Sequence, residues 1–387
     1  MYKLYITALL FVSGNIFSQQ TVNYQSVDSI SYQNYLIGNW EKLLETGKEA
    51  IVQGIDFKNL RKRMGYAYFA KADFYSAQKQ FEKAMTFDTS DLDTRAYLYY
   101  CGLNLDDKTL AGFHASKLPV ETQKKSKIKP FKIIDAVDAE YNYKANDESL
   151  GIRSNPSYYR IGVSTKLSNR LNLYQAVSQY SQTVNNSVLT KQTEYFATLN
   201  WSISSHTTFD LGYHYISTKV DLLTFPGNLF FAKLSTKINR FHVGVNGSIL
   251  TNQMDTTNQI GFNAGYTFPG KANIYVNSTI SALTNKDSTR LIFCQVIGAR
   301  IFKPLWVEAN VTLGNLKNYN DNNGLYLYNS LDATTFRTGL TLFYNLNRNI
   351  TLIGNYTYDK KQMENTITKI NTNYNQHSFS TGVIWKI

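Results

Sequence analysis

The connections between the repeated segments of this chain constrain its fold most strongly. From residue 131 to residue 387, runs of about ten alternating side chains are joined by two kinds of connection in turn. One kind is short and polar, as in Ser168-Asn169-Arg170 and Asn239-Arg240. The other is long and rich in Asn, Thr, Ser and Asp, as in 182–191, 221–228, 251–258 and 360–376. Short turns on one rim and long loops on the other are typical of a transmembrane β-barrel.

The segments predict an antiparallel barrel of about fourteen strands. Merging one hairpin would give about twelve strands, and splitting the segment 316–331 would give about sixteen. An even count places both ends of the barrel on the same rim. Because a helical segment precedes the first strand, we expect that rim to face the periplasm. The fold class is therefore α+β with two domains, a helical stack followed by the barrel.

The composition is compatible with a barrel in a membrane. The 29 Tyr and 22 Phe suit rings placed at two membrane interfaces. A mean hydropathy of −0.32 is no obstacle, because barrel strands are apolar on one face only. The net charge of +12 includes a basic linker at 119–130, which either contacts anionic headgroups or is simply solvated. No nucleic-acid-binding module is recognisable, so nucleic acid is not expected as a partner.

The N-terminus, residues 1–18, has the pattern of a signal peptide. Lys3 is followed by the largely apolar segment 4–17, and the small Ser18 offers a cleavage site. We therefore expect the mature protein to leave the cytoplasm.

Residues 28–118 predict a periplasmic helical domain with an internal repeat. Its clearest copy combines small and bulky residues at helical spacing, namely Gly65, Tyr68, Ala77, Phe81 and Ala84. This spacing resembles the tetratricopeptide repeat, in which small residues let paired helices approach and bulky ones fill the space between pairs. Such a stack would dock a periplasmic partner protein in its groove. A plain helical hairpin domain is the alternative.

Alternation along the strands of the barrel, 131–387, assigns the polar side chains to the lumen. The charged residues predicted to line it are Arg160, Lys166, Glu194, Asp210, Lys233, Lys237, Arg300, Glu308 and Arg337. Charges of both signs suit either a wet channel or a network of paired side chains. Both interpretations stay open.

No catalytic residue, metal ligand or cofactor site is predicted. His242 and Ser248 share a strand face, but they lie too far apart along the strand to hydrogen-bond directly. Cys101 and Cys294 fall in different domains, so a disulfide is not expected. The segment 315–330 combines amides with Tyr, which suits either contact with a glycan or an ordinary loop, folded outward or inward.

The last strand places Phe379, Val383, Trp385 and Ile387 on the lipid face. This pattern resembles the terminal strand that the outer-membrane assembly machinery recognises, although that family pattern usually ends in Phe or Trp. The resemblance implies the assembly machinery as a partner, beside outer-membrane lipid.

The domain order resembles that of the YaiO-like outer-membrane family, and more distantly that of polysaccharide exporters that combine helical repeats with a barrel. The resemblance rests on the repeat residues from Gly65 to Ala84 and on the Trp385-Lys386-Ile387 end. It implies a pore or export accessory for a surface polysaccharide or similar solute, in the outer membrane of a Gram-negative bacterium. The alternative is a non-conducting scaffold or adhesin anchored by its barrel.

Overall fold

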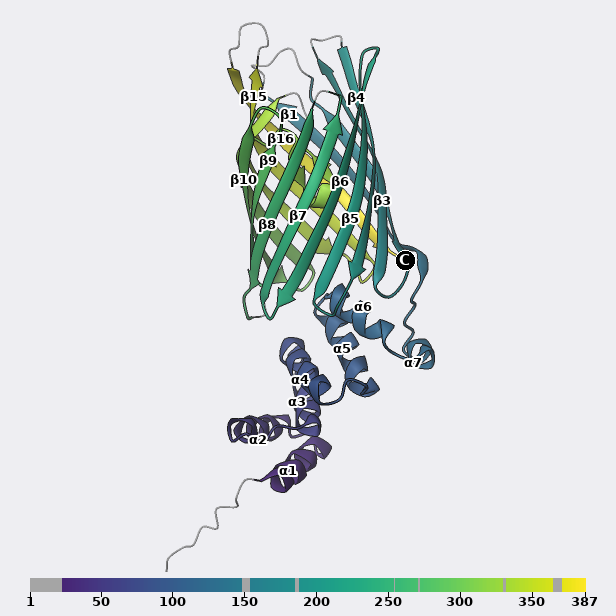
Figure 1. Cartoon of the computed structure of the whole chain (residues 1–387), viewed down its shortest axis with the longest axis vertical. Helices are drawn as coiled ribbons and strands as arrows, with labels where there is room; N and C mark the ends of the chain where they lie inside the picture. Colours follow the sequence, from purple (N-terminus) through teal and green to yellow (C-terminus); the bar gives the residue numbers. More distant parts are fainter. Residues whose placement is uncertain are drawn as a thin grey trace, which may run out of the picture. The chain divides into compact units, whose positions relative to one another are not determined.

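A computed structural model describes residues 23–147, 154–184, 188–253, 255–270, 272–329, 332–364 and 371–387. The predicted signal peptide lies outside the described residues. The chain forms two compact units, one up to Cys101 and one from Gly102 to Ile387. The described part contains seven helices followed by a closed antiparallel barrel of fourteen strands, so the predicted fold class is confirmed (Figure 1).

The first unit is built from antiparallel helices. They are α1 (Tyr24–Leu36), α2 (Trp40–Val52), α3 (Lys58–Ala70), α4 (Phe74–Phe87) and most of α5 (Leu92–Asn104). Asn39 begins α2 and Asp73 begins α4, and each side chain accepts a hydrogen bond from a backbone N–H of the first turn. These caps satisfy donors that a helix N-terminus otherwise leaves unpaired.

The predicted repeat residues pack between α3 and α4. Ala77, Phe81 and Ala84 are at most 1% exposed. A Cβ added at Gly65 would lie 2.6 Å from Phe81 Cε1, so only glycine admits the ring at this helix crossing. Tyr68 is partly buried and packs against the neighbouring core of α1, α2 and α3.

The helices α6 (Lys108–Ser116) and α7 (Val120–Lys125) group with the barrel unit. Gly112 of α6 lies against the carbonyl of Asn169 in the turn 167–170, and Asn169 Nδ2 donates to Gln123 Oε1 at 3.0 Å. Helical periodicity does not record which core a helix packs against. The predicted linker 119–130 likewise contains a short helix.

The barrel wall consists of long antiparallel strands. They are β1 (Lys132–Asn146), β2 (Ser157–Lys166), β3 (Leu171–Val184), β4 (Val188–Ser202), β5 (Thr207–Val220), β6 (Leu223–Ile238), β7 (Phe241–Asn252), β8 (Thr256–Thr267), β9 (Tyr275–Thr284), β10 (Thr289–Phe302), β11 (Leu305–Leu313), β14 (Ala333–Asn345), β15 (Ile350–Glu364) and β16 (Asn371–Lys386). Each strand pairs with its sequence neighbour, β11 pairs with β14, and β1 pairs with β16 to close the wall.

Several segments predicted as long loops are instead extensions of the strands. In 182–191, Gln182 pairs with Thr190, and in 221–228 the strand β6 begins already at Leu223. β15 and β16 continue to pair as far as Glu364 and Asn371. The loop prediction for these segments was wrong because they lack apolar alternation, while backbone pairing between strands does not require it.

The two faces of the wall differ as the alternation predicts. On β8, Ile260 and Phe262 point outward and are 73% and 51% exposed, whereas Gln259 points inward and is 4% exposed. On β4, Tyr195 points outward and Glu194 inward. The outer face thus carries many exposed apolar side chains, and the lumen is polar. Separately, none of the described helices is both long and apolar enough to cross a membrane.

Phe81→Ala is expected to destabilise the helical unit by about 3–5 kcal/mol, because it removes a fully buried ring and leaves a cavity between α3 and α4. Thermal unfolding of the full-length protein in detergent, followed by the helical circular dichroism signal, measures the change. The matched control is Phe87→Ala on the same helix, because Phe87 is 46% exposed. Equal effects of the two substitutions would contradict the packing described.

Acid is expected to weaken the helical unit through Asp56. Arg61 Nε donates to Asp56 Oδ1 at 2.6 Å, and this hydrogen bond holds the pKa of the carboxyl below its usual value. A pKa lowered by folding gives stabilisation that is present above the unfolded pKa and lost as the pH falls through the folded pKa, below about pH 4. Asp56→Asn should therefore reduce the loss of stability between about pH 6 and pH 3 in urea unfolding. Glu45→Gln, in an exposed pair with Lys42, is the control and should change it less.

Candidate functional site in the barrel lumen

The nine predicted lumen residues lie on the inner face of the wall, but the structure divides them into two groups. Five of them line a cavity of about 1000 Å³ inside the barrel, namely Arg160, Glu194, Lys233, Glu308 and Arg337. The other four, Lys166, Asp210, Lys237 and Arg300, lie toward the short-turn ends of their strands. The candidate site is therefore the cavity, which contains these five residues of the predicted set and not the other four.

The short-turn end of the lumen is tied to the helical segment before the barrel. Lys237 Nζ pairs with Asp107 Oδ2 at 2.7 Å, and Asp107 also caps α6. The guanidinium of Arg170 stacks 5.3 Å from the ring of Phe113 on the same helix. The ion pair of Lys237 with Asp107 thus has a structural role, because it fixes α6 on the β5–β6 side of the barrel rim.

The charged side chains around the cavity are largely paired. Arg160 lies 2.9 Å from Glu140 and 3.5 Å from Asp138, and Arg337 lies 3.5 Å from Asp359. Arg160 lies directly opposite Glu140, and Arg337 lies directly opposite Asp359, on neighbouring strands. The lumen therefore contains paired charges, as in the network of paired side chains that the sequence offered as one of two interpretations.

Glu194 is a buried acidic residue of the cavity, with 8% exposure. Its Oε2 accepts a hydrogen bond from Ser178 Oγ at 2.5 Å and lies 3.5 Å from His214 Nε2. Gln192 also donates to the Glu194 carboxylate. Ser178 is bonded to the carboxylate and not to the imidazole, so these three residues do not form the relay that activates a serine nucleophile.

The sequence left open whether the segment 315–330 folds outward or inward. It folds into the lumen as a small hairpin of β12 (Asn320–Asp321), a 3-10 turn η2 (Asn322–Gly324) and β13 (Tyr326–Leu327). We call residues 315–329 the inward loop. It crosses the barrel interior and contacts strands far from β11 and β14, between which it is inserted.

The tip of the inward loop is held against β5 and β6. His214 Nδ1 donates to the carbonyl oxygen of Gly324 at 2.6 Å, and Lys233 Nζ donates to Asn323 Oδ1 at 3.1 Å. Gly324 has a φ of +90°, and a Cβ at this position would lie 2.7 Å from the ring of Phe231. The tip therefore requires glycine both for its backbone conformation and for its close approach to the wall.

Two further contacts fix the sides of the inward loop. Asn320 exchanges two hydrogen bonds with the Gln259 side chain on β8, at 2.9 and 3.0 Å. On the opposite side, Tyr326 Oη donates to Glu140 Oε2 at 2.8 Å, and Arg160 stacks 5.4 Å from the Tyr326 ring. The ion pair of Arg160 with Glu140 is thus also a docking point for the loop.

The base of the inward loop is an apolar cluster. Leu316 and Tyr319 are buried against Leu283 and Ile292 of β9 and β10, with Tyr328 packed beside them. Burying these side chains gives the loop its own small core, since an apolar side chain contributes about 1.5–3 kcal/mol when it leaves water. No alternation marks these residues, so the sequence could not show that their partners lie inside the barrel.

The terminal-strand residues lie on the outer face of β16. Phe379, Trp385 and Ile387 are more than half exposed, and Val383 is 36% exposed. Trp385 pairs in register with Val137 of β1 and with Ile350 of β15. The end of the chain is therefore the strand that completes the wall.

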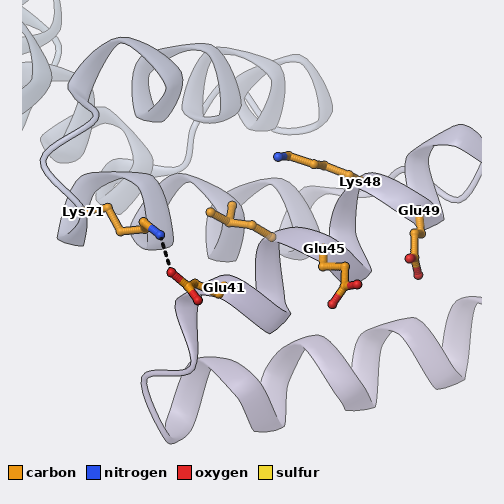
Figure 2. Close-up of a pocket in the computed structure, with 6 residues that line it drawn as sticks. Glu41, Glu45, Lys48, Glu49 and Lys71 are labelled. Atoms are coloured by element: carbon orange, nitrogen blue, oxygen red, sulfur yellow. Dashed lines mark hydrogen bonds and ion pairs between the residues drawn. The ribbon is translucent and has the colours of Figure 1, made fainter.

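The described part of the helical unit carries a shallow polar recess (Figure 2). It is lined by α2 residues that include Glu41, Glu45, Lys48 and Glu49, together with Lys71. Lys71 Nζ lies 3.1 Å from Glu41 Oε1, and both side chains are largely exposed. This recess has no enclosed group that would select a ligand.

His242 Nε2 lies 3.3 Å from Thr267 Oγ1, on the neighbouring strand. Across the described ranges, no three His, Cys, Asp or Glu side chains come together in a way that could hold a metal ion.

No protein-family model matches the chain, and no curated protein matches it. Solved structures with a similar fold include a bacterial polysaccharide outer membrane secretin, with 7% identity over 66% of this chain and 99% of that one, at a TM-score of 0.40. A FadL homologue from Pseudomonas aeruginosa has 8% identity over 72% and 94% of the two chains, at a TM-score of 0.44. The TodX deltaS2S3 mutant, a monoaromatic hydrocarbon channel, has 7% identity over 66% and 91%, at 0.45. Because the sequence identities and TM-scores are this low, the function has to be argued from the residues of this chain.

Gly324→Val is expected to displace the tip of the inward loop, because valine neither adopts a φ of +90° readily nor fits beside Phe231. Hydrogen exchange of residues 318–329 in detergent, measured by mass spectrometry, should then increase at least about tenfold. Gly354→Val on β15 is the matched control, because a Cβ there meets nothing within 4 Å. Unchanged exchange in Gly324→Val would show that the loop does not depend on this contact.

Proposed function

We propose that this protein is an outer-membrane β-barrel that gives restricted passage to a small polar solute, as a pore or export accessory. The observation that carries the proposal is the charged cavity of about 1000 Å³ left between the wall and the inward loop. A barrel that served only as an anchor would not require such a space lined by charged side chains of both signs.

Location in an outer membrane is supported by the distribution of side chains on the wall. Outward residues such as Ile260 and Phe230 are exposed and apolar, while the interior is polar and charged. This arrangement is unfavourable in water and favourable in a bilayer. The closed wall also pairs its backbone groups between neighbouring strands, as a spanning structure must.

The inward loop restricts what can pass. Its contacts with β5, β6 and β8 place it across the interior, so a polymer chain could pass only if the loop moved. We therefore propose that the barrel with its inward loop in place passes small polar solutes. A surface polysaccharide would pass only with assistance. The helical unit would dock a periplasmic partner that supplies the cargo.

A non-conducting scaffold is the second candidate, favoured by the number of contacts that hold the inward loop. The loop is anchored at its tip through Gly324, at its sides through Asn320 and Tyr326, and at its base through Leu316. A plug fixed at all these points could close the lumen permanently.

Planar-bilayer conductance separates the two candidates. The wild-type barrel is expected to give small, discrete conductance steps, because the inward loop leaves only part of the lumen open. Replacing residues 316–329 by a short Gly/Ser linker should raise the conductance severalfold, since the apolar and polar plug is removed. The Gly354→Val variant should behave as the wild type.

Two outcomes would contradict the proposal. A wild-type trace that stays closed while the linker variant conducts would favour the scaffold. Equal conductance of both proteins would show that the loop does not restrict the lumen.

A further inference from the structure

One side of the lumen cavity carries no charged residues. Among the described residues that line the cavity, those on β7, β8, β9 and β10 include no Asp, Glu, Lys or Arg. The ion pairs of Arg160 and Arg337 lie instead on β1, β2, β14 and β15. Side-chain amides line the cavity on the uncharged side and on the next strand, β11, and we call three of them the amide patch, namely Asn246 of β7, Asn277 of β9 and Asn310 of β11.

Each amide of the patch lies against a glycine of the neighbouring strand. The strand register places three pairs directly opposite one another, Asn246 with Gly261, Asn277 with Gly265 and Asn310 with Gly339. A Cβ on these glycines would lie 2.7, 2.9 and 3.3 Å, respectively, from a nitrogen or oxygen atom of the amide. Because glycine leaves that space free, each amide can lie along the wall, and the cavity in front of it stays open.

The amides of the patch are accessible to a solute. Within the described ranges, the three side-chain amides make no hydrogen bond to another residue, and none of their polar atoms is enclosed. All three residues are partly exposed. The neighbouring Asn263 is left out of the patch because its Oδ1 is enclosed. Water satisfies exposed groups of this kind, and the hydroxyl groups of a solute can replace that water.

The amide patch lies beside the docking points of the inward loop. The loop reaches β8, β9 and β10 at Gln259, Leu283 and Ile292. In the strand register, the three amides lie nearer the short-turn end of the barrel than these contacts. The patch therefore faces the part of the cavity on the short-turn side of the loop.

The charges that flank the amide patch are balanced. Lys233 lies opposite Asn246, and its Nζ donates to Asn323 Oδ1 at 3.1 Å. At the other edge, Glu308 accepts a hydrogen bond from the Tyr275 hydroxyl. One cation and one anion, each already bonded, favour an uncharged solute, because a charged group would lose its hydration without gaining a new partner. The rings of Tyr275 and Trp306, 6.4 Å apart, add an apolar surface beyond Glu308.

We propose that the amide patch binds an uncharged oligosaccharide. Each saccharide hydroxyl both donates and accepts hydrogen bonds, and each amide of the patch offers donors and an acceptor in return. Neighbouring strands lie about 4.8 Å apart, so the amides on β7, β9 and β11 span about 20 Å, which suits several sugar units better than one. The inference rests on the proposed function, because it names the class of solute for the same lumen, but binding does not require conduction.

The test is calorimetric titration of the full-length, detergent-solubilised protein with maltotriose and with trigalacturonic acid. Maltotriose is expected to bind at least about tenfold more tightly, because the carboxylates of the acidic trimer would lose water beside strands whose described cavity residues include no cation. Asn246→Leu and Asn310→Leu should each weaken the binding of maltotriose about two- to tenfold, since each removes hydrogen-bonding groups from the patch. Gly261→Ala should also weaken it, because the added Cβ displaces the Asn246 amide.

Asn258→Leu is the matched control, because Asn258 is exposed on the outward face of β8. Its affinity for maltotriose should equal that of the wild type. Heat-modifiable migration on a gel shows that each variant still forms the barrel. Three results would overturn the inference: no binding of maltotriose to the folded wild type, equal binding of the two trimers, or unchanged binding in both folded Asn→Leu variants of the patch. The bilayer measurement reports conduction separately, so a closed barrel that still binds maltotriose would contradict only the proposed function.

Discussion

The pairing of the last strand with the first is the interaction on which the rest of this structure depends. β16 pairs with β1 over eleven residue positions, from Ala136 opposite Lys386 to Asn146 opposite Gln376. Without that pairing, both strands would expose backbone groups that a bilayer cannot hydrogen-bond. Closure also creates an interior, and only inside a closed wall can the inward loop meet several strands at once. The cavity is a consequence of both the closure and the loop.

The lumen combines two kinds of polar group with different consequences. Pairs such as Arg160 with Glu140 are satisfied by each other and hold the inward loop through Tyr326. Near β15 and β16, acceptors such as Gln376 Oε1 have no hydrogen-bond partner among the residues that the structure describes. Satisfied pairs stabilise one arrangement of the lumen, whereas unsatisfied groups favour the entry of a molecule that can pair with them.

Predictions from local pattern succeeded where the pattern has a direct physical cause. Alternation separated Glu194 from Tyr195 and Gln259 from Ile260, because successive side chains of a strand point to opposite faces. Small residues at helical spacing placed Gly65 against Phe81, because only glycine admits that ring. Patterns failed where strand pairing continues without apolar alternation, as at Leu223. Helical periodicity also did not show that α6 lies against the barrel turn at Asn169.

The sequence by itself determined the class of fold, a strand number of about fourteen and the polar character of the lumen, because each follows from periodicity along one strand or helix. Only the tertiary structure decided that the segment around Gly324 folds inward. Its partners His214 and Phe231 lie about a hundred positions earlier in the chain, and no local spacing connects them. The tertiary structure also decided which polar groups of the lumen are left unpaired, because that depends on neighbours brought together by closing the barrel.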